Sequence, residues 1–311
     1  MILDLTVIIP YYNESETIIK TLNQISIQTF KPKNVILVNS SSTDNTSNII
    51  DEWINGNNDE LIKYINLYKE TKLPSSSKNV GLDNTNTEYI AFMDCELEFG
   101  KCWIENQYNR LIKYQKDIVF GSVQLSGMNI IDKCAVAHTY GYYSIKECIP
   151  GSILKKSLFH KIGKFKEHRS GYDVLWRNKL KKVNNNFHTP YEPIVHYMNI
   201  NYSDSYTHLF RKTFMYTYTS EEAFMNSKNS LLLLLFLIII VMLFFSPLFS
   251  IFTTSAYFTF RSFILPVIKS HIIKSEMAKV DFLYNLIITA IIIDMGKALG
   301  TIRNLLNIYG K

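Results

Sequence analysis

The chain has 311 residues, of which 47% are hydrophobic and 19% are charged, and its formal net charge is +6. This apolar content is enough for a substantial core and argues against a disordered chain, while so mild a charge argues against a nucleic-acid-binding protein. The four cysteines have no C-x-x-C pair and no regular spacing, so they indicate neither a zinc site nor a disulfide framework: Cys95, Cys102, Cys134 and Cys148.

Short apolar runs alternate with segments of helical periodicity from residue 5 to residue 120. Val7–Ile9 and Val35–Val38 have the composition of buried strands, and each is followed by apolar residues at helical spacing, such as Ile18 and Leu22. Strands that alternate with helices in this way pair in parallel through right-handed crossovers. The pattern predicts an α/β domain with a doubly wound, mostly parallel sheet.

An apolar run, Tyr89–Met93, ends at two acids that are separated by one residue, Asp94 and Glu96. The run is typical of a strand buried in a parallel sheet, and ligands bind open α/β sheets at the carboxyl ends of such strands. In an extended backbone the two carboxylates project to the same side, while Cys95 points away. They can therefore converge on one hard cation, or they can be solvated acids in a strand-to-helix turn.

The stretch from residue 121 to residue 225 has a mixed pattern that is rich in Tyr, His and Lys. Helical periodicity is visible near residues 172–180 and from 206 to 224. The sequence leaves the other elements of this stretch open.

A long stretch without charge lies between Lys228 and Arg261. About 20 apolar residues, at about 1.5 Å each, cross the hydrocarbon of a bilayer, so we expect a membrane helix here. Pro247 predicts a break that makes residues 230–268 a hairpin. Residues 281–305 form a third hydrophobic helix, either spanning or interfacial and amphipathic. The chain is thus expected to divide into a domain of residues 1–225 and a membrane region of residues 226–311.

The orientation of the chain follows from its lysines and from its first residues. Lys269, Lys274 and Lys279 lie just beyond the hairpin, as the positive-inside rule expects of a cytoplasmic loop. The first residues have no basic start and no small-residue cleavage site, so no secretion signal is expected. We therefore expect a multi-pass membrane protein whose first domain faces the cytoplasm.

Three segments stand in the order and at the spacing of a known family: Val7–Glu14, Val38–Thr46 and Phe92–Glu96. With them, the chain resembles family 2 glycosyltransferases over about residues 5–215. The resemblance implies a nucleotide-sugar-binding domain of the GT-A fold, followed here by a C-terminal transmembrane region. It also implies an inverting transfer of a sugar.

By this resemblance, Asp94 and Glu96 match the metal-binding D-x-D motif, with Glu in the second position. The longer arm allows ligation directly or through water. Mg²⁺ or Mn²⁺ is the expected ion, because oxygen ligands suit hard cations and the charge that grows on the leaving diphosphate needs neutralising. His196 stands where many relatives carry a histidine that faces the metal or the diphosphate; the alternative is a structural histidine.

The resemblance also implies the donor-binding residues: Pro10, Tyr12, Glu14, Asn39, Lys78, Asp94 and Arg211. Asn39 replaces the usual Asp that accepts a hydrogen bond from uracil, and its amide still pairs with uracil but discriminates less. A UDP-sugar is therefore the expected donor. Lys78 can reach a phosphate as a point charge, or it can be a surface lysine.

On the acceptor side, Asp173 matches the carboxylate that takes the proton of the attacking group. It also fits the first turn of a helix, where the dipole favours an acid. Tyr172 stands in place of the usual Glu. Gly151, Tyr172 and Trp176 are expected to bind the acceptor, although Trp176 also fits a place in the core.

The leading hypothesis is a membrane-anchored, metal-assisted glycosyltransferase that acts on a hydroxyl or phosphate of a lipid-linked or cell-surface glycan, as in cell-envelope synthesis. No Gln-x-x-Arg-Trp motif is present, so single transfer rather than polymerisation is implied. The alternative is a catalytically degenerate nucleotide-binding scaffold, because Asn39, Glu96 and Tyr172 all depart from the family pattern. No Gly-rich phosphate loop follows the first strand, which argues against a dehydrogenase or a nucleotidyltransferase.

Overall fold

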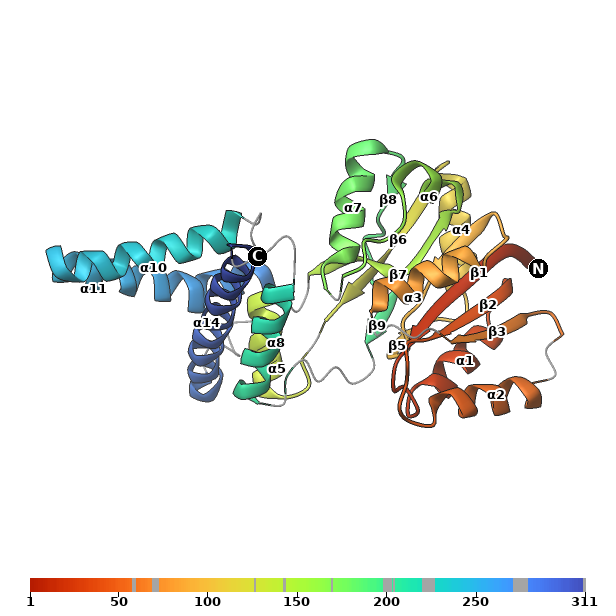
Figure 1. Ribbon diagram of the computed structural model, residues 1–311, viewed down its shortest axis with the longest axis horizontal. Helices are drawn as coiled ribbons and strands as arrows, with labels where there is room; N and C mark the ends of the chain where they lie inside the picture. The colour runs from red at the N-terminus through yellow and green to blue at the C-terminus, as the bar shows by residue number, and fades with distance from the viewer. Residues whose placement is uncertain are drawn as a thin grey trace. The chain divides into compact units, whose positions relative to one another are not determined.

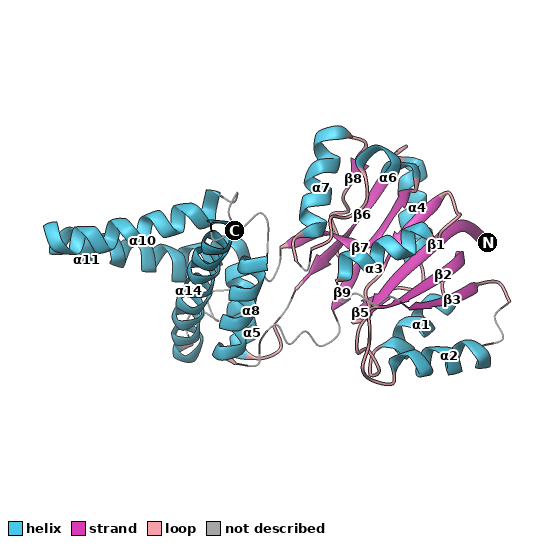
Figure 2. Ribbon diagram, in the orientation of Figure 1, coloured by secondary structure: helices cyan, strands magenta, loops and turns pink. Residues whose placement is uncertain are grey.

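The computed structural model describes residues 1–57, 60–68, 73–125, 127–141, 144–168, 170–197, 203, 205–219, 227–270 and 279–309. The chain divides into two compact units (Figures 1 and 2). The first comprises residues 1–124 and 145–198, and the second comprises residues 125–144 and 199–311.

The first unit is built on a mixed sheet in the order β3-β2-β1-β4-β7-β6-β9-β5, with β8 beside β6. Its strands are β1 (Ile2–Tyr11), β2 (Lys31–Asn39), β3 (Lys63–Tyr68), β4 (Tyr89–Phe92), β5 (Leu97–Phe99), β6 (Ile118–Gln124), β7 (Ile145–Lys155), β8 (Phe187–His188) and β9 (Val195–Tyr197). The strands β1 to β4 are parallel, and β7 runs antiparallel to both β4 and β6. The mostly parallel α/β sheet expected from the sequence is therefore confirmed.

Helices connect these strands and cover the sheet. They are α1 (Ile18–Ser26), α2 (Thr46–Gly56), α3 (Pro74–Asp83), α4 (Trp103–Lys113), α6 (Ser157–Ile162) and α7 (Tyr172–Val183). The apolar spacing of α1 buries Ile18, Leu22 and Ile25 completely. Helix α3 lies close to β1 because Gly81 has no side chain: a Cβ there would come within 2.4 Å of Ile8 Cγ2.

The parallel register brings the carboxyl ends of the strands to one edge of the sheet. Tyr11 pairs with Asn39, and Asn39 pairs with Tyr68 on the other side of β2. On the far side of β1, Ile8 pairs with Phe92, two residues before Asp94. The segments that follow β1, β2 and β4 therefore meet at this edge.

The second unit is helical. It contains α5 (Ile130–Thr139), α8 (Tyr206–Thr219), α10 (Ser227–Phe245), α11 (Pro247–Thr259), the π-helical turn η1 (Phe260–Ile264), α12 (Leu265–Ser270) and α14 (Val280–Tyr309). Among the described residues, two helical stretches are long and apolar enough to cross a membrane, Pro247–Ser270 and Val280–Leu306. Both suggest that this unit associates with a membrane. The helix expected from 206 to 224 is described as far as Thr219, and its last part lies outside the described residues.

The second unit includes residues from both sides of position 225. Helices α5 and α8 belong to the same compact unit as α10 to α14, because they pack on α14. Gly296 and Gly300 of α14 allow this contact, since a Cβ on Gly300 would lie 2.7 Å from the carbonyl oxygen of Phe214. A domain boundary near residue 225 stays a prediction.

A buried polar network holds the second unit together. Arg261 donates two hydrogen bonds to the carboxylate of Asp294, at 2.7 and 2.9 Å, and a third to Nδ1 of His138 at 2.7 Å. Because arginine only donates, Nε2 of His138 carries the ring proton and donates it to the carbonyl of Leu286, 2.7 Å away. Tyr257 completes the set with a hydrogen bond of 2.6 Å to Asp294.

Candidate active site

The loops after β1 and β2 hold each other in place. Asn13 and Ser41 have φ angles of 58° and 63°, a left-handed conformation that is uncommon outside glycine and clusters at functional sites. The backbone N–H of Asn13 donates to Ser42 Oγ at 3.1 Å, and that of Thr43 donates to Asn13 Oδ1 at 2.8 Å. The loops after β1 and β2 are therefore held together by hydrogen bonds at this edge of the sheet.

Asn39 lies at the end of β2 and is only 5% exposed. Its Oδ1 accepts the backbone N–H of Ser42 at 2.8 Å, which forms a local turn. One lone pair of this oxygen and the amide N–H₂ remain for a ligand. Of the other expected base-pocket residues, Pro10 is half-buried and Tyr12 is exposed at the same strand ends.

Three carboxylates gather at this edge. Burial raises the pKa of Glu14 to about 7, and the nearby charges of Glu96 and Asp94 add to the rise. The side chain of Glu14 is held by Thr17, and its backbone N–H donates to Thr46 Oγ1 at 2.8 Å. A site that crowds carboxylates in this way gains from a cation.

Lys78 lies on α3 with 2% of its surface exposed, so it is not the surface lysine that was the alternative. Its ammonium donates to Asp94 Oδ1 at 2.7 Å and to the hydroxyl of Tyr172 at 3.3 Å. Burial is the largest single influence and by itself would lower the pKa of Lys78, but the charges and hydrogen bonds of Asp94 and Tyr172 together outweigh it and raise that pKa above its ordinary value. The hydroxyls of Ser40 and Ser77, 2.5 Å apart, tie α3 to the end of β2 and so fix Lys78.

The donor chemistry at Asp94 and Glu96 fits a hard divalent ion. Glu96 is exposed, and the side chain of Asp94 is 37% exposed, so both reach the surface of the edge. Cys95 points inward with 2% exposure, as expected. Within the described part of the chain, no group of three or more His, Cys, Asp or Glu side chains could hold a metal by itself. Mg²⁺ commonly takes only one or two carboxylates and completes its shell with water and substrate phosphates.

Asp173 stands in the first turn of α7, next to Tyr172. The guanidinium of Arg177, one turn later, donates to Asp173 Oδ2 at 3.5 Å and to the carbonyl of Glu147 at 2.8 Å. Burial raises the pKa of Tyr172, which lies close enough to feel the charges of Lys78, Asp94 and Asp173. Tyr172 therefore joins the donor side of the site to Asp173.

Two of the expected acceptor residues lie in the interior instead. Trp176 is 3% exposed, stacks on Phe159 and donates its indole N–H to the carbonyl of Gly163 at 2.8 Å. Gly151 is buried in β7, where its carbonyl accepts hydrogen bonds of 2.9 Å from Trp103 and Gln107. Both residues pack the core beneath the site, and their contact with an acceptor stays a prediction.

Two further residues are not brought to this cluster by any described contact. His196 is exposed on β9, where it pairs with Glu98 of β5. Arg211 is exposed on α8 and belongs to the second unit. The ligand role of His196 and the diphosphate role of Arg211 stay predictions.

Glu147, which binds Arg177 beside Asp173, was not expected from the sequence. Glu147 accepts from both Arg177 and Lys181, whose Nζ lies 2.8 Å from Glu147 Oε1. The spacing of Asp173 and Arg177, four residues apart on an expected helix, was a usable signal for their ion pair. Glu147 lies on β7, in the stretch whose elements the sequence did not predict.

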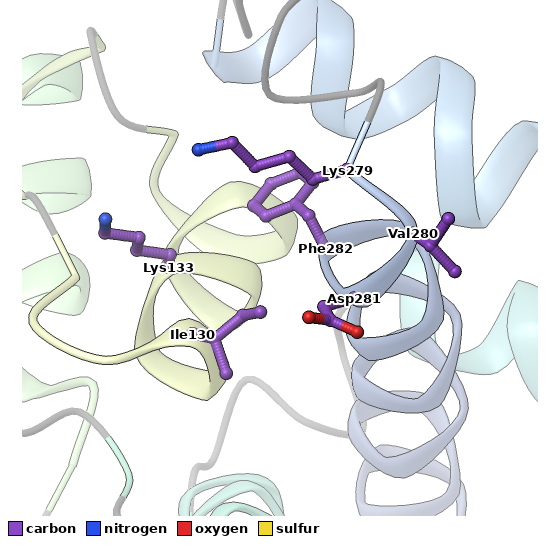
Figure 3. A pocket seen from close by; sticks show the side chains of 6 residues that line it. All are labelled: Ile130, Lys133, Lys279, Val280, Asp281 and Phe282. Carbon is purple, nitrogen blue, oxygen red and sulfur yellow. The ribbon is translucent and has the colours of Figure 1, made fainter.

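A cavity of about 320 Å³ lies in the second unit (Figure 3). It is lined by Ile130 and Lys133 of α5 and by the start of α14 with the residue before it, Lys279, Val280, Asp281 and Phe282. Its lining has one carboxylate, that of Asp281, and includes none of the residues described at the strand ends. We assign it no part in the chemistry at the strand ends.

Comparison with known proteins agrees with this geometry. The model of a family described as Glycosyl transferase family 2 matches residues 6–174. The glycosyltransferase GlyA of Streptococcus pneumoniae is 33% identical over 118 residues, which are 38% of this chain and 16% of the relative. The GalNAc(5)-diNAcBac-PP-undecaprenol beta-1,3-glucosyltransferase of Campylobacter jejuni is 27% identical over 125 residues, which are 34% of this chain and 40% of the relative. The chain thus matches less than half the length of either relative.

One solved structure resembles nearly the whole chain. The mannosyltransferase PcManGT from Pyrobaculum calidifontis, in complex with GDP-Man and Mn²⁺, superposes with a TM-score of 0.54 on 98% of this chain and 87% of its own. At 16% identity this likeness shows a shared fold.

Proposed function

As a member of glycosyl transferase family 2 the chain is a glycosyltransferase, and we propose that it is an inverting, non-processive one that uses a UDP-sugar. The observation that carries this proposal is the contact of Lys78 with both Asp94 and Tyr172, directly beside Asp173. This contact links the sheet edge proposed to bind the nucleotide-sugar, with its lysine and carboxylates, to a candidate base. The family match ends at residue 174, so it includes every member of this cluster.

Lys78 and Asn39 are the proposed donor contacts of the chain. The ammonium of Lys78 is fixed by Asp94 and offers a positive charge to a diphosphate without further ordering. The free lone pair and N–H₂ of Asn39 pair with uracil, with Pro10, Tyr12 and Glu14 on the neighbouring strand end. A Mg²⁺ or Mn²⁺ ion held by Asp94 and Glu96 would supply Lewis-acid stabilisation to the leaving diphosphate.

Asp173 is the proposed base. A hydroxyl is a poor nucleophile, so its attack on the sugar needs a carboxylate within hydrogen-bond reach to accept its proton. Arg177 holds the Asp173 carboxylate from one side, which leaves the other oxygen for the acceptor. Tyr172 offers the acceptor a hydroxyl that is already oriented by Lys78.

We propose a lipid-linked or cell-surface glycan as the acceptor and a membrane as the location. The two apolar helical stretches support membrane association, and a tether keeps enzyme and lipid substrate in one plane. The relative from Campylobacter is named for an undecaprenol-linked substrate, which supports the same class of acceptor. Lys269 and Lys279 favour the cytoplasmic face for the first unit.

The test is a panel of nucleotide-sugars, scored by metal-dependent release of free nucleotide with a lipid-linked acceptor. Asp173→Asn is expected to lower turnover by about 10² to 10⁴, because a positioned base contributes that much, while UDP binding with Mn²⁺ stays unchanged. Asp83→Asn, a change of the same kind at an exposed carboxylate, is the control. Full turnover in Asp173→Asn would remove this residue from the mechanism. Absence of both turnover and metal-dependent UDP binding in the unchanged chain would favour the degenerate scaffold.

A further inference from the structure

Helices α10 and α11 form a hairpin that turns at Ser246 and Pro247 (Figure 1). The hydroxyl of Ser250 donates to the carbonyl of Ile239 at 3.0 Å and so joins the two arms. Farther down, the rings of Phe236 and Tyr257 pack edge to face with centroids 5.8 Å apart. The arms therefore lie against each other along the hairpin.

The outer surface of this hairpin is apolar up to its tip. Phe244, Phe245 and Leu248 are 84%, 81% and 83% exposed, and Phe252 is 72% exposed. Ser250, by contrast, is turned inward and is 1% exposed. A surface of this kind is not stable in water and requires an apolar partner.

The uncharged apolar part of each arm is shorter than a bilayer is thick. The uninterrupted apolar part of the first arm, Leu231–Phe245, has 15 residues and so spans about 22 Å. The second arm is helical from Pro247 to Ser270, but its part before Arg261 has 14 residues and spans about 21 Å. The hydrocarbon of a bilayer is about 30 Å thick, so either arm penetrates about two thirds of it.

The turn is suited to hydrocarbon rather than to water on a far side. A connection that leaves the bilayer usually carries polar or charged residues, whereas the turn has one serine between Phe245 and Pro247. The N–H of Ser246 donates to the carbonyl of Met242 at 2.8 Å, and its carbonyl accepts from Ser250 at 3.0 Å. Pro247 has no N–H to leave unpaired. Most of the backbone groups at the turn are therefore satisfied without water.

The polar groups of the unit lie at the base of the hairpin. The network of Arg261, Asp294 and His138 begins where α11 ends. Helix α14 packs along α8, from the hydrogen bond between Tyr206 and Asn285 to that between Asn304 and the carbonyl of Tyr218.

The second long apolar stretch, α14, is therefore unlike a spanning helix. Its packing partner α8 exposes His208 and Arg211, and charged side chains are costly at the centre of a bilayer. In the most apolar part of α14, 44% of the residues are buried inside the protein, against 17% in the most apolar part of Pro247–Ser270. Helix α14 is thus covered by protein where α11 is bare.

We propose that this chain is a monotopic membrane protein: the hairpin of α10 and α11 enters the bilayer, turns inside the hydrocarbon and leaves on the side it entered. Helices α5, α8 and α14 stay at that surface. This inference rests on the membrane association proposed above and replaces the expected multi-pass topology. It places both ends of the hairpin on the side of the acceptor's polar head.

The experiment uses the full chain in sealed vesicles, with a single added cysteine and a membrane-impermeant maleimide applied from each side in turn. Leu248→Cys and Phe245→Cys mark the tip, and Val280→Cys, 78% exposed at the start of α14, marks the base. The unchanged chain, whose four cysteines are buried or half-buried, gives the baseline. We expect Val280→Cys to react from one side, and both tip variants to react from neither side until detergent is added. A fluorophore at position 248 should be quenched by nitroxides on lipid tails and not by a water-soluble quencher.

Reaction of the tip from the side opposite Val280→Cys would show a crossing and overturn the monotopic arrangement, while leaving the proposed function intact. Reaction of the tip from the same side would show that the hairpin does not insert, and would overturn it too. A chain that is absent from the membrane fraction would contradict the membrane part of the proposed function as well. As a second measure, Leu248→Lys should lower the membrane-bound fraction about tenfold, because a lysine in hydrocarbon is disfavoured. Tyr191→Lys, at an exposed position of the first unit, should not change it.

Discussion

At the scale of single residues, Lys78 is where the two sides of the site meet. It is buried, yet its partner Asp94 is partly exposed, so the pair lies at the boundary between core and solvent. Replacing Lys78 by Met removes the charge and keeps most of the volume. We expect sugar transfer to fall at least 100-fold and the free energy of unfolding to fall by about 1.5–3 kcal/mol, the usual contribution of a charged hydrogen bond.

The matched control is Lys164→Met, because Lys164 makes an ion pair of 2.5 Å with Asp83 in which both side chains are about half exposed. Exposed pairs contribute about 0–1 kcal/mol, so this variant should stay close to the unchanged chain in both measurements. Urea unfolding and a steady-state transfer assay compare the two. Equal effects of both substitutions would contradict the role given to Lys78.

Glu14 gives the site a pH dependence of stability. Its pKa is about 7 in the folded chain and near 4.5 when unfolded, so between these values the folded chain binds more protons than the unfolded one. Stability contributed by this group is therefore lost as the pH rises from about 4.5 to about 7. Glu14→Gln should remove that loss. At pH 8 its free energy of unfolding should exceed that of the unchanged chain by about 1–2 kcal/mol, after allowance for partial exposure, and its urea midpoint should be higher.

The measurement is the urea midpoint of both chains at pH 5 and pH 8, without nucleotide or metal. Glu16→Gln, two residues away on the surface, serves as the control. If Glu14→Gln keeps the same loss of stability between the two pH values, Glu14 is not the group that titrates.

At the scale of elements, the contact between α8 and α14 depends on glycine. A Cβ at position 300 would lie 2.7 Å from the carbonyl of Phe214 and 2.9 Å from Thr217 Cβ, and a backbone carbonyl cannot move aside cheaply. Gly300→Leu is expected to separate the helices and lower the free energy of unfolding by about 1–3 kcal/mol, as overpacking does. Thermal unfolding in detergent measures this, with Leu299→Ala on the exposed side as the control. A Gly300→Leu chain as stable as the control would mean that the helices do not pack this closely.

The elements that the sequence predicted well are those whose apolar residues form a continuous or periodic pattern. Strands β1, β2 and β4 each contain a continuous apolar run, so their place and the position of Asp94 at a strand end could be read directly. Strands β5 and β9 have three residues each and pair across almost a hundred positions, which gives no local period to detect. Helix α3 carries Ser75, Ser76 and Ser77 in buried positions, so its polar sequence concealed the burial of Lys78.

At the scale of the whole molecule, the site is assembled from segments that the sequence predicts to different degrees. The donor edge comes from the first 96 residues, where motif and periodicity agree. Asp173 was predicted by resemblance alone, and the strand that carries Glu147, the second partner of Arg177, came only with the tertiary fold. The expected domain boundary depended on hydropathy, which cannot show that α5 packs on a helix about 150 residues later.

Ligand binding should stabilise the whole chain in a metal-dependent manner. Donor-edge carboxylates are close together, so a divalent ion and UDP are expected to bind better together than alone. At about 100 times the dissociation constant, bound ligand adds about 2.7 kcal/mol to the free energy of unfolding. Thermal unfolding with UDP and Mn²⁺, each alone and both together, measures this, and excess chelator should reverse the gain. An equal shift with UDP alone would contradict a metal-dependent donor site.

The π-helical turn at Phe260–Ile264 has one residue more than an α-helical turn of the same rise. At its start, Arg261 reaches Nδ1 of His138; after it, Lys269 and Ser270 reach carbonyls of the same helix, those of His138 and Ala137. Deleting a single residue such as Phe263 would restore a regular helix and rotate everything beyond it by about 100°. Arg261 would then face a different direction from Lys269 and Ser270. The number of residues between them, and not only their side-chain chemistry, therefore decides whether both sets of contacts to α5 can form at once.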